Sequence, residues 1–223
     1  MSGRHFDVIS RDVLPFVRTI ISTTWRVYLE NPEIALNETV TAMTFKTSDC
    51  CDACNEAMAC VLPFYSYGRR RYFAGTIRTI KCFEDIALMR NAVNEPGNDQ
   101  VLVIDGGGSL SRALFGDVMA NIALCNGWVG LVINGVIRDS VEINDIDIGV
   151  KALGTVSRRG ERTGAGEVDV PVHFGGITFT PGHRLVADED GVIVLPTGVI
   201  ETDIAVEDAL IATAAYASAA GQS

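Results

Sequence analysis

The sequence of 223 residues has no uninterrupted apolar run close to the ~20 residues that span a bilayer, and its N-terminus lacks the apolar segment of a secretory signal. It is also poor in basic residues, because 18 Lys and Arg stand against 28 Asp and Glu, for a net charge of -10. Nucleic-acid binding depends on clustered Lys and Arg that neutralise phosphates. We therefore expect no direct nucleic-acid partner, no membrane partner and a cytoplasmic location, although the sequence leaves an organellar one open.

Complete metal-binding and redox motifs are missing as well. The six cysteines include one CxxC pair, Cys51 and Cys54, but a structural zinc site needs a second pair of ligands, and the three histidines do not supply one at a suitable spacing. A redox CxxC would follow a strand in a thioredoxin-like βαβ unit, which residues 45–49 do not indicate. We therefore expect the cysteines to be free, buried thiols.

Nucleotide-binding motifs are incomplete. The glycine-rich stretch 106–111 follows an apolar run, but it lacks the last small residue of the dinucleotide-binding fingerprint. No Gly-Lys-Ser/Thr follows it as in a P-loop. Neither NAD nor ATP is therefore predicted as a cofactor.

What the sequence does contain is a unit of alternating apolar and glycine-rich segments near its middle. Val101–Asp105 predicts a buried strand that runs into three glycines, and Val118–Cys125 predicts a helix. The apolar run Trp128–Ile133 predicts a second strand, which would carry Asn134-Gly135 and then Arg138-Asp139 to its far end. The glycine loops and the Arg-Asp pair should therefore meet at one edge of a sheet.

The polar residues of this unit suit an acidic ligand. Asp117 stands where a helix N-cap belongs, so the amides of Val118 and Met119 are among the unpaired donors of a helix start and favour an anion such as a carboxylate. Arg138 offers a planar fork to the same carboxylate, and Asp139 is a hard oxygen ligand for Mg²⁺ or Mn²⁺. Each feature alone also fits an ordinary turn, cap or surface ion pair. Together they indicate a site for a keto acid.

The order of these motifs is similar to that of a known family. The stretch GGGSLSRALFGD ends at Asp117, twenty residues separate it from Arg138-Asp139, and Glu142 follows. The segments DIDIGVKALGT, GAGEVDVPVHFGGITFTPGH and ADEDGVIV continue the likeness. Over residues 47–195 the chain resembles the RraA-like family. That family includes the regulators of ribonuclease activity A and the divalent-metal class II 4-hydroxy-4-methyl-2-oxoglutarate aldolases.

The resemblance also implies a fold. Strands mixed with helices predict a single α/β domain, and the family implies a swivelling β/β/α sandwich that assembles as a homotrimer and sometimes as a hexamer. The RraA-like domain would cover residues 47–223. Residues 1–46 would form an N-terminal extension, in which Asp12 can cap an amphipathic helix that ends by Asn31. An Ala-rich helix is predicted for residues 201–220.

The aldolases of the family imply roles for particular residues. Four matching positions would hold the pyruvyl half of a small keto-acid substrate: Gly116, Asp117, Val118 and Met119. The match to Arg138 also binds this half, and the match to Asp139 binds Mg²⁺ or Mn²⁺. Such an enzyme would cleave 4-hydroxy-4-methyl-2-oxoglutarate or decarboxylate oxaloacetate. Arg138 and the ion would stabilise the pyruvate enolate, while Asp117 would hold a water of the ion that donates or accepts a proton.

Two further implications of the resemblance concern contacts with other chains. In the aldolases a neighbouring subunit supplies an acidic group, for which Glu201 and Glu207 are candidates. The ribonuclease regulators of the family instead bind a ribonuclease without catalysis, through an exposed surface for which Arg69-Arg70-Arg71 and the loop 158–162 are candidates. Many of these regulators lose the Asp of the Arg-Asp pair, so Asp139 favours the enzyme.

Overall fold

A computed structural model describes residues 46–201 of the chain. The helices predicted for residues 12–31 and 201–220 lie outside the described residues, apart from Glu201, and so does Glu207. The division of the chain at residue 46 therefore stays a prediction.

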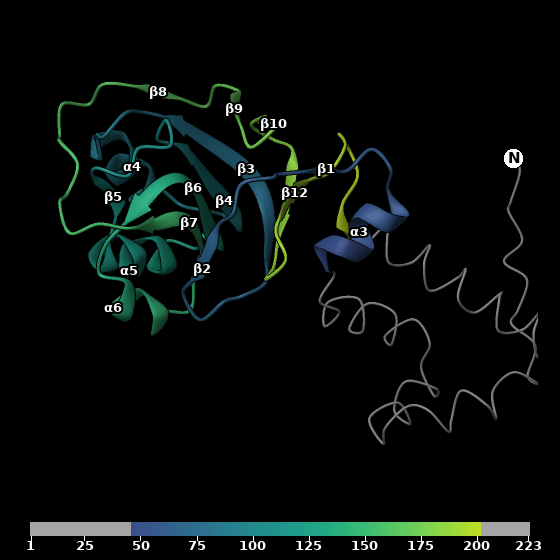
Figure 1. The fold of residues 1–223 in the computed structure, drawn as a ribbon, viewed down its shortest axis with the longest axis horizontal. Coiled ribbons are helices and arrows are strands. Elements are labelled where there is room, and N and C mark those ends of the chain that lie inside the picture. Colours follow the sequence, from purple (N-terminus) through teal and green to yellow (C-terminus); the bar gives the residue numbers. More distant parts are fainter. Residues whose placement is uncertain (1–45, 202–223) are drawn as a thin grey trace, which may run out of the picture. The chain divides into compact units, whose positions relative to one another are not determined.

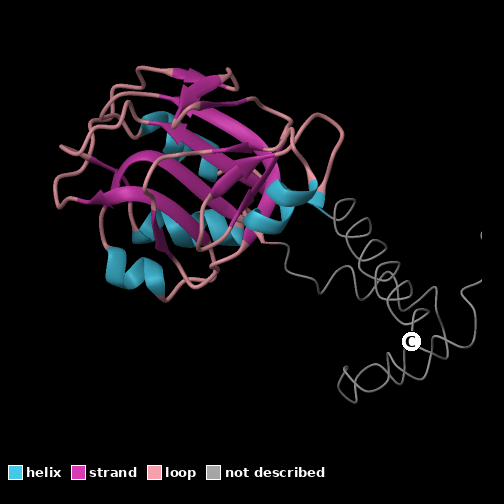
Figure 2. Cartoon of the chain, turned by 45° about the vertical axis from the view of Figure 1, so that its right-hand side comes forward, coloured by secondary structure: helices cyan, strands magenta, loops and turns pink. Residues whose placement is uncertain are grey.

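A large mixed sheet with short helices makes up the described part (Figures 1 and 2). Its strand order is β1-β12-β11-β3-β4-β6-β7-β2, with β5 beside β6 and β8 beside β3, and β9 and β10 form a separate hairpin. The helices are α3 (Thr47–Ala53), α4 (Ala87–Val93), α5 (Asp117–Cys125) and α6 (Ser140–Asn144). The strands are β1 (Met58–Ala59), β2 (Tyr65–Tyr67), β3 (Phe73–Lys81), β4 (Gln100–Asp105), β5 (Ala113–Phe115), β6 (Gly130–Ile137), β7 (Gly149–Thr155), β8 (Glu167–Val168), β9 (Val172–Phe174), β10 (Ile177–Phe179), β11 (Arg184–Ala187) and β12 (Val192–Val194).

The centre of the sheet is parallel. Neighbouring strands β3, β4, β6 and β7 all run in the same direction, and α4, α5 and α6 lie in the connections between them. Parallel strands need such crossover connections, and the crossover helices cover a face of the sheet. The strand predicted at 101–105 and the helix predicted at 118–125 are confirmed as β4 and α5.

Strand β6 is longer than predicted. It runs to Ile137, so Asn134-Gly135 lies inside the strand and not in a loop at its end. Asn134 is paired with Asp105 of β4, and its carbonyl accepts hydrogen bonds from the amides of Gly106 and Gly108. The pairing of β6 with β7 is irregular between Ile133 and Val136, which is where the Asn-Gly pair lies. The neighbouring strands β4 and β7 thus hold Asn134-Gly135 in an extended conformation, although this dipeptide is typical of turns.

Side chains of the central strands alternate between two hydrophobic cores. On one face, Leu102 and Ile104 pack with residues of α4, α5 and α6. On the other face, Val101 and Val103 pack with residues of β9, β10, β11 and β12. Buried residues on both faces are expected of parallel strands covered on two sides. The predicted β/β/α sandwich is confirmed.

The prediction of free, buried cysteines is confirmed only in part. All six cysteines are free, but only Cys50 and Cys82 are buried and Cys125 is exposed, so the expectation of buried thiols was right for two of them. Burial raises the pKa of the Cys82 thiol to about 12, which keeps it protonated at neutral pH. Within residues 46–201, no helix is long and apolar enough to cross a membrane.

Candidate active site

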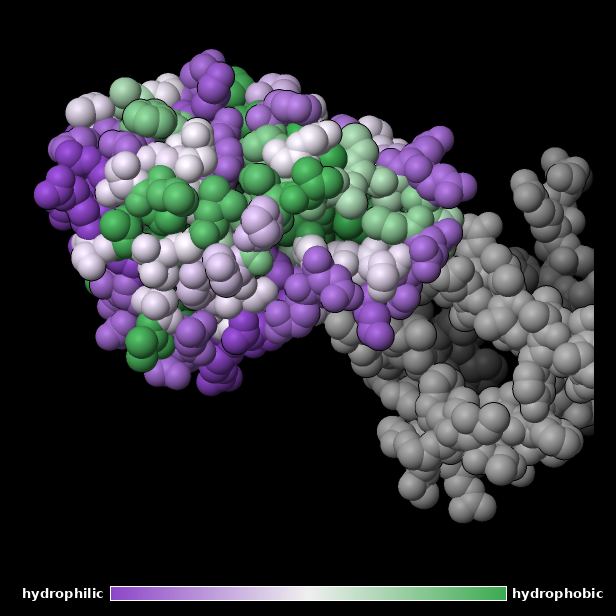
Figure 3. Space-filling view, viewed as in Figure 1, coloured by the Kyte–Doolittle hydropathy of each residue, from purple (hydrophilic) through white to green (hydrophobic). Residues whose placement is uncertain are grey.

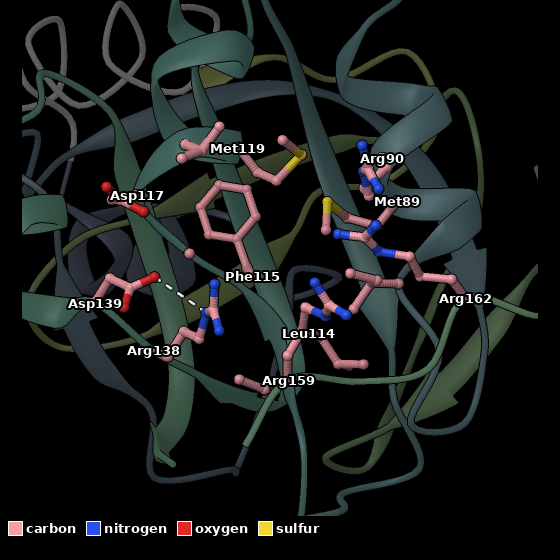
Figure 4. Close-up of a pocket in the computed structure, with 14 residues that line it drawn as sticks. Met89, Arg90, Leu114, Phe115, Asp117, Met119, Arg138, Asp139, Arg159 and Arg162 are labelled. Carbon is pink, nitrogen blue, oxygen red and sulfur yellow. Dashed lines mark ion pairs between the residues drawn. The ribbon is translucent and has the colours of Figure 1, made fainter. Parts of the chain in front are cut away.

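A small pocket opens where β5 and β6 end and α5 begins (Figure 4). Its volume is about 190 Å³, below the roughly 300–1,000 Å³ of sites for drug-sized ligands. It is therefore of a size for a small metabolite. The lining residues are Ile86, Met89, Arg90, Ala113, Leu114, Phe115, Gly116, Asp117, Val118, Met119, Arg138, Asp139, Arg159 and Arg162.

The start of α5 forms one wall of the pocket. The structure places Gly116, not Asp117, at the N-cap, with extended backbone angles of φ -156 and ψ 179, and Asp117 is the first helical residue. The amide of Met119 donates to the carbonyl of Gly116 at 3.1 Å, so it is not one of the free donors that we predicted. Among the described residues, the amides of Asp117 and Val118 have no acceptor. These two amides, at the positive end of the helix dipole, can receive an anion.

Arg138 and Asp139 lie beside this helix start because β5 pairs with β6. The amide of Arg138 donates to the carbonyl of Phe115 at 3.0 Å, which carries the pairing to the last residue before Gly116. Asp139 then adopts a left-handed conformation, with φ 55 and ψ 41, and caps α6. Asp is one of the few residues other than glycine that visit this region readily. The turn therefore presents both side chains to the pocket.

The two side chains form an ion pair that leaves most of their bonding capacity free. Arg138 Nε lies 3.1 Å from Asp139 Oδ2, and both side chains are about one-third exposed, at 39% and 35%. Neither Arg138 Nη1, Arg138 Nη2 nor Asp139 Oδ1 has a partner among the described residues. The guanidinium can therefore donate to a ligand while the carboxylate keeps an oxygen for a cation.

Gly116 leaves the space that brings these groups together. A Cβ at this position would lie 2.7 Å from Asp139 Oδ2 and 3.4 Å from Arg138 Cγ. Any larger residue would push the Arg138-Asp139 pair away from the helix start. Asp117 and Asp139 lie on the same side of the pocket in Figure 4, so two hard carboxylate ligands line one wall.

The opposite side of the pocket is basic. Arg90 of α4 and two residues of the loop after β7, Arg159 and Arg162, lie across Phe115 from Asp117 (Figure 4). The loop arginines were predicted to lie on a protein-binding surface, and no role was predicted for Arg90. No local signal could have found this wall, because its members come from separate segments that meet only in the folded chain.

A buried carboxylate anchors the loop that carries Arg159 and Arg162. Asp85 is 3% exposed and accepts hydrogen bonds from the Thr163 amide and hydroxyl and from the amides of Gly164 and Ala87. Burial disfavours the ionised form of Asp85, but these hydrogen bonds outweigh it and lower its pKa. The loop is thus tied to the start of α4, which carries Arg90.

Several residues that the sequence singled out lie away from the pocket. The glycine loop 106–108 packs on Asn134 and does not line it. Two of the three histidines lie there too: His173 is hydrogen-bonded to Thr178, and His183 to Thr197. Within residues 46–201, no group of three or more His, Cys, Asp or Glu side chains could hold a metal ion.

A family model and a known protein are similar in sequence to this chain. A family model described as Aldolase/RraA matches residues 47–194. A protein of Aromatoleum aromaticum with the provisional name 4-hydroxy-4-methyl-2-oxoglutarate aldolase is 50% identical over 153 residues, which cover 68% of this chain and 96% of that protein.

Two solved structures are similar to the described fold. The RNA-processing inhibitor RraA from Thermus thermophilis is 43% identical, with a TM-score of 0.68, over 70% of this chain and 98% of that one. A Geobacillus kaustophilus protein named S-adenosylmethionine: 2-dimethylmenaquinone methyltransferase is 47% identical, with a TM-score of 0.65, over 67% and 93% of the two chains. The names of these relatives describe different activities, so the comparisons show common ancestry but do not identify one reaction. On the matched residues and the shared fold, this chain belongs to the RraA-like family.

Proposed function

We propose that the protein is a divalent-metal-dependent lyase that releases pyruvate from a small keto acid, as a 4-hydroxy-4-methyl-2-oxoglutarate aldolase or an oxaloacetate decarboxylase does. The observation that carries the proposal is the close approach of the α5 start, Arg138 and Asp139 around Gly116. An anion site, a guanidinium and a hard carboxylate then share one small pocket. The aldolase name of the 50% identical relative supports the same reaction class.

The donor set fits Mg²⁺ or Mn²⁺. Both ions prefer oxygen ligands, and Mg²⁺ typically keeps several waters and uses only one or two protein carboxylates. Asp139 would hold the ion through its free oxygen, with Asp117 on the same wall. When bound, the ion would supply positive charge beside the carbonyl oxygen on which the enolate charge develops.

Individual residues can then be assigned to steps of the reaction. The free amides of Asp117 and Val118 bind the carboxylate of the pyruvyl half. In aldol cleavage, Asp117 accepts the proton of the C4 hydroxyl through a water, the C3–C4 bond breaks, and its electron pair forms the enolate of pyruvate. Arg138 donates hydrogen bonds to the enolate oxygen and stabilises it. A proton returned to C3 completes pyruvate.

We do not assign Glu201 as the acidic group that a neighbouring subunit would supply to the site. Glu201 is buried and accepts hydrogen bonds from Nε and Nη2 of Arg184 in its own chain, at 2.7 and 2.5 Å. A carboxylate engaged in this way is costly to move. Glu207 remains the candidate from the sequence.

The test of the proposal is pyruvate release by the purified protein. We expect pyruvate from 4-hydroxy-4-methyl-2-oxoglutarate or oxaloacetate in the presence of Mg²⁺ or Mn²⁺, measured with lactate dehydrogenase and NADH. EDTA should stop the release, and added metal should restore it. Release no faster than that caused by the metal alone in buffer would refute the enzyme assignment.

Arg138→Lys tests whether the planar fork is needed. Lysine keeps the positive charge but cannot donate two parallel hydrogen bonds from one rigid group. We expect kcat/KM for pyruvate release to fall at least ~10-fold, about 1.4 kcal/mol of transition-state stabilisation. The same change at Arg158, an exposed arginine outside the pocket, should leave the kinetics unaltered. A lysine variant with normal kinetics would show that charge alone suffices.

The ribonuclease regulator remains the second candidate, favoured by the 43% identity to a protein named as an RNA-processing inhibitor. One of its predicted surfaces is partly neutralised, because Arg70 pairs with Asp147 at 3.1 Å and Arg71 with Glu189 at 3.7 Å. Tight binding to a ribonuclease without pyruvate release would favour this role. A regulator would need neither the metal ion nor the pocket.

Assembly as a homotrimer or hexamer also stays a prediction. Apolar residues form a band between polar ones across the face shown in Figure 3. Exposed apolar surface of this kind favours contacts with other chains. Large hydrophobic side chains exposed among residues 46–201 are Val61, Tyr65, Phe83, Leu110, Val118, Val141, Val168 and Ile200.

A further inference from the structure

We propose that Arg90, Arg159 and Arg162 form a second anion subsite, which binds a carboxylate on the half of the substrate that leaves. The three residues would then determine specificity for keto acids with carboxylates at both ends, and would favour aldol cleavage over decarboxylation. The inference rests on the proposed function, since it places the pyruvyl half at the α5 start.

The first observation is that these three guanidinium groups lack counterions. They line the same pocket, yet none of them has an ion-pair partner among the described residues. Arg90 is partly buried, and Arg159 and Arg162 are exposed. By comparison, the partly buried arginines Arg78, Arg112 and Arg184 each pair with a carboxylate. An acidic protein has therefore left three cations unpaired on one side of one pocket.

The second observation is that the other cations of the pocket act on Arg162. Desolvation, and then repulsion from Arg159, Arg90 and Arg138, lower the pKa of the Arg162 guanidinium. Like charges gathered in this way are relieved by an anion. Guanidinium groups bind carboxylates with two parallel hydrogen bonds, which suits a planar carboxylate better than a single point charge would.

The third observation is that the fold builds this arrangement. Asp85 ties Thr163 and Gly164 to the start of α4, as described above. The amide of Gly160 donates to the carbonyl of Ala113 at 2.9 Å, and a Cβ at Gly160 would lie 2.7 Å from the carbonyl oxygen of Glu84. The backbone between Arg159 and Arg162 is thus held against β5 and the start of α4, so the backbone of the site needs little ordering when a ligand binds.

Charge development decides which reaction such a subsite favours. In aldol cleavage the distal carboxylate keeps its negative charge from substrate to product, so an arginine can stay bound to it throughout. In decarboxylation of oxaloacetate the distal carboxylate leaves as neutral carbon dioxide. An arginine bound to that group would stabilise the substrate more than the transition state and would slow the step.

The experiment compares two ligands that differ only at the distal end. 2-Oxoglutarate has the pyruvyl end and a distal carboxylate, whereas 2-oxopentanoate has the same chain length without the second carboxylate. Calorimetric titration of the Mg²⁺-loaded protein should give a Kd for 2-oxoglutarate at least ~10-fold lower, as expected of a charge-assisted pair. The double variant Arg159→Gln/Arg162→Gln should bind the two ligands alike and bind pyruvate as the wild type does.

Controls separate this inference from the proposed function. Arg158→Gln changes an exposed arginine of the same loop outside the pocket and should keep the preference. Arg90→Gln, from α4, should weaken it independently of the loop. Equal affinity of the wild type for both ligands, with pyruvate bound, would overturn the subsite and leave the lyase standing. Failure to bind pyruvate with Mg²⁺ present would overturn both.

Kinetics give a second readout. In the double variant, kcat/KM for 4-hydroxy-4-methyl-2-oxoglutarate should fall at least ~10-fold, while that for oxaloacetate decarboxylation should fall far less or rise. An equal fall for both substrates would contradict the proposed bias toward aldol cleavage.

Discussion

Asp139→Asn should lower kcat/KM for metal-dependent pyruvate release at least ~100-fold, about 2.7 kcal/mol, with the fold intact. Asparagine retains the shape of the side chain and tolerates the left-handed backbone, where φ is 55. It removes the negative charge that would hold the cation and keeps an oxygen for Arg138 Nε. Steady-state kinetics over a range of Mn²⁺ concentrations, with Mn²⁺ binding followed by electron paramagnetic resonance, provide the measurement.

Asp99→Asn is the matched control for this substitution. Asp99 is also an aspartate in the left-handed region, with φ 59, and is exposed outside the pocket. Its replacement should leave both Mn²⁺ binding and turnover unchanged. Wild-type turnover in Asp139→Asn would remove Asp139 from the site, whereas lost turnover with normal Mn²⁺ binding would give it a role other than holding the ion.

Gly116→Ala should reduce kcat/KM by about 100-fold, because a displacement of ~1 Å in a reacting group can cost that much. The extended backbone of Gly116 admits alanine, so the loss would come from the new methyl group and not from the backbone. That methyl would lie 2.7 Å from Asp139 Oδ2, so the carboxylate must move, and Arg138 with it. Kinetics and a thermal melt of the same sample measure the two effects.

The melt should show only the loss of a glycine N-cap, which costs about 1 kcal/mol or less. Gly191→Ala is the control, because a Cβ there would meet no atom within 4 Å. It should melt and react like the wild type. Normal kinetics in Gly116→Ala would mean that the Arg138-Asp139 pair does not need its present position beside α5.

Much of this architecture followed from the sequence because it depends on local patterns. Apolar runs bounded by glycines predicted β4, β6 and α5. The α5 start and Arg138-Asp139 could be named as one site because each is contiguous in the chain and the resemblance places them together. Cap assignment failed by one residue, as Gly116 and not Asp117 holds the N-cap. Asn134-Gly135 was expected to end a strand since that dipeptide is typical of turns.

Only the tertiary structure decided the rest, since it depends on pairings between distant segments. The register of β5 against β6 sets Gly116 beside Asp139, and pairing with β4 keeps Asn134 extended. Hydrogen bonds to Asp85 bring the start of α4 and the loop after β7 together, and these two segments carry the arginines of the basic wall. Local propensity carries no information on such contacts, because a charged loop has the same sequence whether it faces solvent or a pocket. Tertiary packing made Arg159 and Arg162 part of the candidate site.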